Sequence, residues 1–168
     1  DRIKLAIDQN ERILVYGDYD ADGVTSTTIL VSTLRLLGAQ VGWYIPNRFT
    51  EGYGPNELAF KNAYDEGISL IITVDNGIQG HHEISTIQEL GVDVIVTDHH
   101  EIGETLPDAF AIVHPMHPNF EYPFKYLCGA GVAYKLAQGL IEHPPQHFIA
   151  LAAIGTIADL VSLTDENR

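Results

Sequence analysis

Cysteine, basic residues and long apolar runs are all scarce in this sequence. The single cysteine, Cys128, excludes an internal disulfide and is typical of a reducing compartment, where such a residue usually packs in the core. The longest apolar stretch, Phe148 to Ile157, is much shorter than the ~20 residues that a membrane-spanning helix needs. The first residues lack the basic segment and apolar core of a signal peptide. We therefore expect a soluble, cytoplasmic protein with no membrane partner.

The shortage of positive charge restricts the choice of partner. Nine Lys and Arg stand against 23 Asp and Glu, which gives a formal net charge of −14. Sequence-independent binding to nucleic acid depends on clustered Lys and Arg, so this segment alone is a poor surface for a polyanion. Many of the acidic residues, however, belong to a cluster whose charge a metal ion would reverse locally. Any basic surface that function requires would have to come from elsewhere in a longer chain.

The pattern of apolar runs predicts the fold class. The length of 168 residues and the apolar content of 45% suit one domain with a hydrophobic core. Segments of helical length alternate with short strand-like runs, which predicts an α/β fold with a parallel sheet, helices on both faces and a helical C-terminal part. The expected strands are 13–15, 41–45, 70–74, 92–97 and 111–113, and the expected helices are 24–37, 55–66 (with Pro55 in its first turn), 81–90, 129–142 and 146–157.

Acidic and histidine residues follow three of the predicted strands. Asp18, Asp20 and Asp22 come directly after the first strand, Asp75 follows the third, and Asp98–His100 follow the fourth. The loops at the carboxyl ends of parallel strands form the ligand crevice of such a sheet, so these residues are expected at one edge. Carboxylates packed this densely are tolerable at neutral pH only if a cation lies among them or some stay protonated. The sequence therefore predicts a metal site.

The first acidic motif could also be a calcium loop or a simple turn. An EF-hand calcium loop needs a bidentate Glu at its twelfth position, where this sequence has Ile29, and the segment before the loop is strand-like instead of helical. The acids of an Asp-Gly turn can also be plain solvated or helix-capping residues. Capping stays open for the first motif alone, but three motifs at one edge favour metal binding.

The remaining histidines have no evident partner in the sequence. We expect all six on the surface: His81, His82, His114, His117, His143 and His147.

Together these motifs carry a resemblance to a known family. They are Gly17–Ser26, Pro46–Phe49 with Glu51–Gly54, Val74–Gly77, Asp98–His100, Cys128–Ala133, and Gly155–Leu160 with Glu166–Arg168. In this order, over essentially the whole chain, the sequence resembles the catalytic DHH domain of the RecJ family of single-strand-specific exonucleases. The loop 46–54 and the ending around Asp159 distinguish RecJ from the manganese pyrophosphatases and the small phosphodiesterases of the same superfamily.

The resemblance implies a site with two metal ions, usually Mn²⁺, with Mg²⁺ as the alternative. Asp22, Asp75, His99 and Asp159 would hold one ion, while Asp20 and Asp75 would hold the other, so that Asp75 bridges them. Mixed carboxylate and imidazole ligands suit Mn²⁺ better than Mg²⁺, which prefers oxygen ligands. These residues, together with His100, are the expected catalytic residues.

Four further residues have expected supporting roles. His100 is better placed to contact the scissile phosphate than to bind metal, while Asp18 and Asp98 would orient ligands or water. Arg48 is expected to hold a terminal 5′ phosphate through its planar guanidinium. A surface ion pair between Arg48 and Glu51 is the alternative.

The implied activity is metal-dependent 5′ to 3′ hydrolysis of single-stranded DNA in repair and recombination, with a single-strand-binding protein and a helicase as expected partners. Residues 1–168 would be the DHH catalytic domain of a longer chain, without its DHHA1 and oligonucleotide-binding domains. The alternatives are a short-oligonucleotide or cyclic-dinucleotide phosphodiesterase and a non-catalytic DHH interaction scaffold. A scaffold would be expected to have lost metal ligands, and all are present here.

Overall fold

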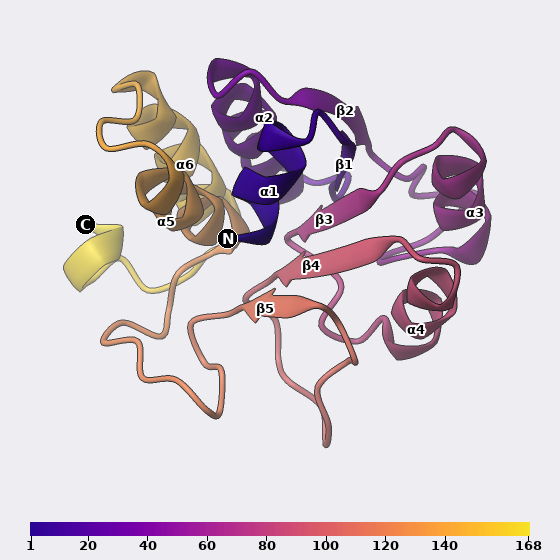
Figure 1. Cartoon of the computed structure of the whole chain (residues 1–168). Helices are drawn as coiled ribbons and strands as arrows, with labels where there is room; N and C mark the ends of the chain where they lie inside the picture. Colours follow the sequence, from indigo (N-terminus) through magenta and orange to yellow (C-terminus); the bar gives the residue numbers. More distant parts are fainter.

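Five parallel strands form one sheet at the centre of the molecule, in the order β2-β1-β3-β4-β5 (Figure 1). The structure is a computed structural model that describes residues 1–168. The strands are β1 (Arg12–Tyr16), β2 (Gln40–Tyr44), β3 (Leu70–Val74), β4 (Asp93–Thr97) and β5 (Ala111–Val113). All five predicted strands are confirmed to within one residue at each end.

Helices cover both faces of the sheet, as predicted. They are α1 (Arg2–Asp8), α2 (Ala21–Leu36), α3 (Glu57–Asp65), α4 (His81–Glu89), α5 (Gly129–Leu140) and α6 (His147–Ala158), followed by the short 3₁₀ helix η1 (Asp165–Asn167). Helices α3 and α4 lie on one side of the sheet, whereas α1, α2, α5 and α6 lie on the other (Figure 1). The expected α/β fold with a helical C-terminal part is confirmed.

The central strand β3 shows how the two cores form. Every residue of β3 is buried, and successive side chains point to opposite faces. Leu70, Ile72 and Val74 pack in the core beneath α1 and α2. Ile71 packs on the other face, with Phe60 of α3 and side chains of α4. An uninterrupted apolar strand is what a sheet covered on both faces requires.

Helices α5 and α6 pack mainly against α2, and Leu136 and Leu140 of α5 also reach the core over the strands. Ile29 of α2, Ala130 and Ala137 of α5 and Phe148 of α6 share a buried cluster with Cys128. Cys128 is a core residue, as expected, and its sulfur also caps α5 by accepting from the backbone N–H of Gly131. This arrangement brings the start of α5 and the end of α6 to the edge of the sheet where the acidic motifs lie.

Two helix starts differ from the prediction by more than one residue. Helix α2 begins at Ala21 instead of residue 24, because the Asp20 carboxylate accepts a 2.8 Å hydrogen bond from the Gly23 N–H and caps the helix. Pro55 lies before α3 and not in its first turn, since the Asn56 side chain caps that helix by accepting from the Ala59 N–H. Capping is therefore one real role of the first acidic motif.

Helix α1 was not predicted at all. Its seven residues bury only Ile3 and Ala6, which is too little periodicity to recognise in a sequence. Two ion pairs hold it in place: the Arg2 guanidinium lies 2.6 Å from the nearby Glu11 and 2.5 Å from Asp93, which is distant in sequence and lies on β4. None of the helices combines the length and the apolar content that crossing a lipid bilayer requires.

Candidate metal centre

The carboxyl ends of β1, β3 and β4 bring the three acidic motifs together at one edge. Candidate ligand atoms fall into groups within 4.8 Å of one another: Asp22, His99 and Asp159; Asp75, His99 and His100; and Asp18, Asp20 and Asp75. Asp159 joins them from the end of α6. All five metal ligands predicted from the sequence are therefore neighbours, and Asp75 and His99 each belong to more than one group.

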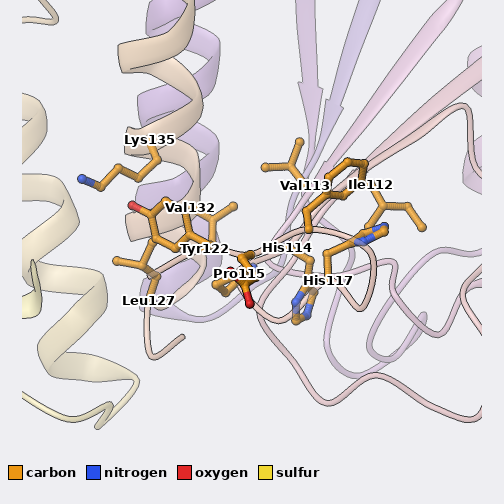
Figure 2. Close-up of a pocket in the computed structure, with 11 residues that line it drawn as sticks. Ile112, Val113, His114, Pro115, His117, Tyr122, Leu127, Val132 and Lys135 are labelled. Atoms are coloured by element: carbon orange, nitrogen blue, oxygen red, sulfur yellow. The ribbon is translucent and has the colours of Figure 1, made fainter. Parts of the chain in front are cut away.

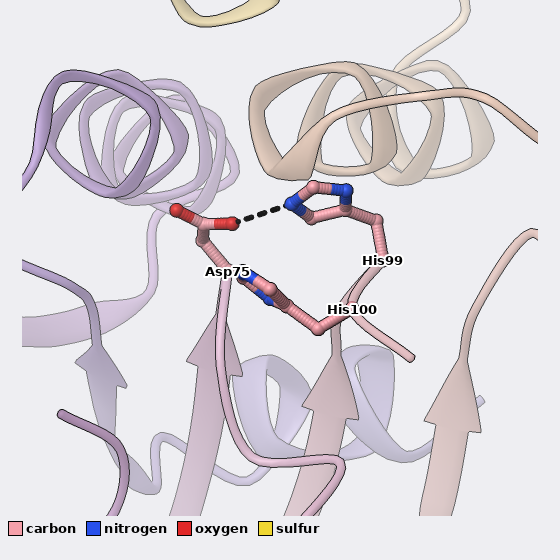
Figure 3. Close-up of side chains that lie close together, drawn as sticks. All are labelled: Asp75, His99 and His100. Atoms are coloured by element: carbon pink, nitrogen blue, oxygen red, sulfur yellow. Dashed lines mark ion pairs between the residues drawn. The ribbon is translucent and has the colours of Figure 1, made fainter. Parts of the chain in front are cut away.

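His99 lies at the centre of one group of ligands. Its Nε2 atom is 3.1 Å from Asp75 Oδ1, 3.6 Å from Asp22 Oδ2 and 3.7 Å from Asp159 Oδ2. Figure 3 shows the His99 ring directed at the Asp75 carboxylate. An ion held about 2.0–2.2 Å from each donor would separate neighbouring donors by about 3.0–3.6 Å. The spacing thus suits one shared cation.

Buried atoms without partners support the same conclusion. Both His99 Nε2 and Asp75 Oδ1 are buried and form no hydrogen bond, although they are only 3.1 Å apart, so their approach lacks hydrogen-bond alignment. Asp18 Oδ1 is a third buried atom of this site without a partner. Unsatisfied polar atoms in a native fold call for a physical cause, and a bound ion is a common one. Imidazole nitrogen with carboxylate oxygens is a donor set that fits a divalent cation.

The turn after β3 fixes the Asp75 side chain. Asp75 has a φ of +62°, a left-handed conformation that Asp tolerates better than most residues. The turn is tied together because Thr73 Oγ1 donates to the Asn76 carbonyl at 2.7 Å and Asn76 Nδ2 donates to the Val74 carbonyl at 2.9 Å. Burial, followed by the charge of Asp22, holds the pKa of Asp75 far above its usual range.

Asp22 is anchored by α5. Its Oδ2 accepts from the Gly129 N–H at 2.6 Å, and its Oδ1 accepts from the Ala130 N–H at 2.8 Å. Asp22 lies in the first turn of α2, and its side chain is almost fully buried. Each carboxylate oxygen keeps a second lone pair for a cation.

Asp18 and Asp20 differ in exposure. Asp20 is exposed and uses one oxygen to cap α2. Asp18 is buried, and burial raises the pKa of its carboxyl. The structure adds Asp18 to the candidate ligands, a role that the sequence prediction did not give it.

Asp98 and Tyr53 hold the His100 ring. Asp98 Oδ1 lies 2.7 Å from His100 Nδ1, and the Tyr53 hydroxyl lies 3.0 Å from the same nitrogen. The Tyr53 hydroxyl also donates to the Asp75 carbonyl at 3.1 Å. Sequence reasoning missed Tyr53, although it had singled out the loop that carries it. His100 Nε2 has no partner in the protein.

These contacts also shift the pKa values of both residues. Burial would raise the pKa of Asp98, but the hydrogen bond and charge of His100 and the bonds from backbone N–H groups bring it below its usual range. The hydrogen bond to Asp98 raises the pKa of His100. The ring of His100 therefore favours the protonated form more than a free imidazole does.

Arg48 lies exposed in the loop after β2, with its guanidinium carbon 5.2 Å from the centre of the Tyr19 ring. The alternative ion pair with Glu51 is wrong. Glu51 instead accepts from the Tyr44 hydroxyl and from the Asn47 N–H. The guanidinium stays free of any carboxylate.

The expectation of a surface position is wrong for His114. This residue is buried, its Nε2 lies 2.8 Å from the His100 carbonyl, and its Nδ1 accepts from the Met116 N–H at 3.0 Å. The carbonyl can only accept, so Nε2 carries the proton of a neutral ring. Burial correspondingly lowers the pKa of His114. By contrast, His82, His143 and His147 are exposed as expected, and His82 Nε2 lies 2.8 Å from Glu57.

A separate apolar pocket lies between β5, the connection 114–127 and α5 (Figure 2). Its volume is about 240 Å³, and Ile112, Tyr122, Val132 and Lys135 are among the residues that line it. None of the candidate metal ligands reaches it. The pocket therefore plays no part in the metal centre.

Comparisons with known proteins place this geometry in a family. Over its full length the chain is 62% identical to the single-stranded-DNA-specific exonuclease RecJ of Bacillus subtilis, of which it spans 21%. A crystal structure of exonuclease RecJ bound to manganese matches 99% of the chain, with 44% identity and a TM-score of 0.89, and the chain covers 43% of it. A RecJ structure in complex with Mn²⁺ from Thermus thermophilus matches with 41% identity and a TM-score of 0.83, and there the chain covers 24%.

The family model described as "DHH family, N-terminal domain" matches residues 12–157. That range runs from the start of β1 almost to the end of α6, so it includes the whole sheet and nearly every candidate ligand. The chain therefore belongs to the DHH family, of which it contains the N-terminal domain.

Proposed function

We propose that this chain is the catalytic DHH domain of a longer, metal-dependent exonuclease that hydrolyses single-stranded DNA from the 5′ end, in DNA repair and recombination. The observation that carries the proposal is the buried, unpartnered pair of Asp75 Oδ1 and His99 Nε2 inside a complete set of carboxylates. The relative in Bacillus subtilis is named for this activity, and it is 62% identical over the whole chain.

The donor atoms fit two cations. Asp22, Asp75, His99 and Asp159 would hold one, whereas Asp20 and Asp75 would hold the other, with Asp18 close to the second group. The mixed donor set favours Mn²⁺ over Mg²⁺. Related RecJ structures are described as bound to manganese and to Mg²⁺. Two bound cations would supply charge stabilisation for the phosphodiester and a lowered pKa for water.

The protein's own groups perform the remaining tasks. Asp98 and Tyr53 fix His100 through Nδ1, which leaves Nε2 to donate a hydrogen bond to a phosphate oxygen. A raised pKa of His100 favours that donor form. Arg48, free of any carboxylate, would bind a terminal 5′ phosphate with two parallel N–H groups.

The rest of the activity belongs to parts outside these residues. The chain spans 21% of its Bacillus subtilis relative, and its net charge of −14 opposes binding to DNA. We assign binding of the DNA strand to further domains, of the DHHA1 and oligonucleotide-binding kinds. A single-strand-binding protein and a helicase are the proposed partners, and the proposed location is the cytoplasm.

The test uses the full-length protein and 5′-phosphorylated DNA in manganese buffer. Progressive release of mononucleotides from the 5′ end of single strands, with matched duplexes left intact, is the expected result. Asp75→Ala should abolish turnover more completely than Asp20→Ala or Asp159→Ala, because it removes the only ligand shared by both proposed cations. Cleavage confined to di- to tetranucleotides would identify a short-oligonucleotide phosphodiesterase. No cleavage of any substrate would identify a scaffold.

A further inference from the structure

The contact between α2 and α5 joins one metal-ligand candidate to a helix end. Both oxygens of Asp22 accept backbone hydrogen bonds, from Gly129 at 2.6 Å and from Ala130 at 2.8 Å. These donors are in the first turn of α5, where N–H groups have no partner within the helix and the helix dipole attracts negative charge. The first turn of α5 therefore fixes both the position and the rotation of the Asp22 carboxylate.

Two glycines at this contact are present for space and not for backbone freedom. Gly129 and Gly155 lie in helices without the positive φ that favours glycine, unlike Gly77 with its φ of +107°. Glycine inside a helix is less favourable than alanine by roughly 0.5–1 kcal/mol. Their missing side chains therefore point to a steric requirement.

Each missing Cβ would overlap a proposed metal ligand. A Cβ on Gly129 would lie 2.4 Å from Asp75 Oδ1 and 2.6 Å from Asp75 Cγ. A Cβ on Gly155, in α6, would lie 2.4 Å from Asp22 Oδ1 and 2.6 Å from Ala130 Cβ. The atom of Asp75 that a Gly129 methyl would strike is the same buried oxygen that lacks a hydrogen bond. Asp75 has little room to yield, because the turn after β3 holds it.

We infer that Gly129 and Gly155 are positioning residues of the metal centre: their bare backbone lets the first turn of α5 hold Asp22 while the Asp75 carboxylate stays free for a cation. The inference rests on the metal site of the proposed function, but not on the nature of the substrate. Neither glycine touches the reacting atoms, and each acts through a carboxylate.

The test measures Mn²⁺ affinity by calorimetric titration of the metal-free protein, so cleavage is not needed. Gly129→Ala and Gly155→Ala should each weaken binding by roughly tenfold to a hundredfold, the range found when residues that orient ligands are changed. Gly139→Ala is the matched control, because it lies in the same helix with nothing within 4 Å of the added methyl. It should bind Mn²⁺ as the wild type does. Circular dichroism melts of the metal-free variants check that each one folds.

A second measurement needs no variant. Amide hydrogen exchange of the metal-free wild type should show Gly129 and Ala130 protected, unlike the uncapped first-turn amides of α4. Wild-type affinity in folded Gly129→Ala and Gly155→Ala would overturn the inference, as would fast exchange at Gly129 and Ala130. Absence of exonuclease activity would disprove the proposed function. The Mn²⁺ affinities and the exchange rates would still test the role of the two glycines.

Discussion

Asp75 and His99 each keep a buried atom without a hydrogen-bond partner. An unsatisfied buried polar group costs about 1–3 kcal/mol, which is a large share of the stability of a small domain. A cation between these atoms would remove both penalties. Metal binding at the proposed centre would therefore be coupled to folding stability through these two side chains.

Mn²⁺ should raise the melting temperature of the chain more than Mg²⁺ does at the same concentration. Binding to the native state alone stabilises by mass action, by about 2.7 kcal/mol at a hundred times the dissociation constant, and the imidazole of His99 favours Mn²⁺. Differential scanning fluorimetry measures the two shifts.

The controls for this shift are single substitutions at the same edge. Asp22→Ala and His99→Ala should remove most of the difference between the metals, whereas His100→Ala should keep it, because Asp98 and Tyr53 hold the His100 Nδ1. Equal shifts with both ions would argue against a ligand set that contains His99.

Metal uptake should release a proton, and affinity should rise with pH. Burial and the charge of Asp22 raise the pKa of Asp75, so the metal-free fold favours the protonated form of its carboxyl, and a cation would displace that proton. Asp75 also makes the stability of the metal-free fold depend on pH. Its contribution to the free energy of unfolding is fully present below its ordinary pKa of 3.8 and is lost as pH rises toward the raised pKa of the folded state. Calorimetry in buffers of different ionisation enthalpy counts the proton. An observed enthalpy that is independent of the buffer would contradict this assignment.

The residues that sequence could predict are those whose position follows from strand order. Asp20, Asp22, Asp75 and His99 follow strands that end at one edge, so their proximity needed no side-chain detail. The environment of His114 depended instead on tertiary contacts. Its partner is the backbone carbonyl of His100, and no sequence pattern marks a carbonyl as an acceptor.

The loop between β2 and α3 is held by polar contacts at three places. Glu51 accepts from the Asn47 N–H, the Tyr16 hydroxyl donates to the Gly54 carbonyl, and the Tyr53 hydroxyl reaches His100 and the Asp75 carbonyl. The loop that carries Arg48 is thereby connected to the turn after β3 and to the ring of His100. The residue proposed to bind the 5′ phosphate and the residue proposed to contact the scissile phosphate are thus held by one anchored loop.

Tyr53→Phe in the full-length protein should lower kcat by about fivefold, because one hydrogen bond that orients His100 is worth about 1 kcal/mol. KM and Mn²⁺ affinity should stay unchanged, since the ring and the metal ligands remain. Tyr126→Phe, at an exposed ring, is the control and should have no effect. Steady-state kinetics on 5′-phosphorylated single strands separate the two constants, and an unchanged kcat in Tyr53→Phe would show that the hydroxyl is dispensable.

At the level of elements, apolar runs predicted every strand, and the signal is most continuous in β3 and β4, where β-branched residues are buried on both faces. Helix ends were harder to predict. The start of α2 depended on whether Asp20 used its side chain as a cap, a choice between two plausible roles for one carboxylate. Helix α1 is held by the ion pair between Arg2 and Asp93, a contact between distant parts of the sequence.

The molecule as a whole combines a candidate metal centre with an unfavourable charge for its proposed substrate. A net charge of −14 repels phosphates, and phosphate neutralisation supplies most of the nonspecific affinity for DNA. Catalysis and DNA binding would then reside in different parts of the full-length protein.

The 168-residue chain alone should therefore cleave long single strands poorly, even with Mn²⁺ bound. The full-length protein should digest them processively and lose affinity steeply as salt rises. The measurement compares both proteins on 5′-phosphorylated strands of several lengths over a salt series. Processive digestion by the 168-residue chain would show that catalysis and DNA binding do not require separate domains.

The ligands of the proposed centre come from near the two ends of the chain, from Asp20 at the start of α2 to Asp159 at the end of α6. Contacts this distant in sequence form late in folding, because the entropy of closing a long loop must be overcome first. A nascent chain therefore has no complete site until α6 has docked beside α2. Loading of the proposed centre with metal would then follow the docking of α6, and a transient opening of α6 would take Asp159 out of the ligand set.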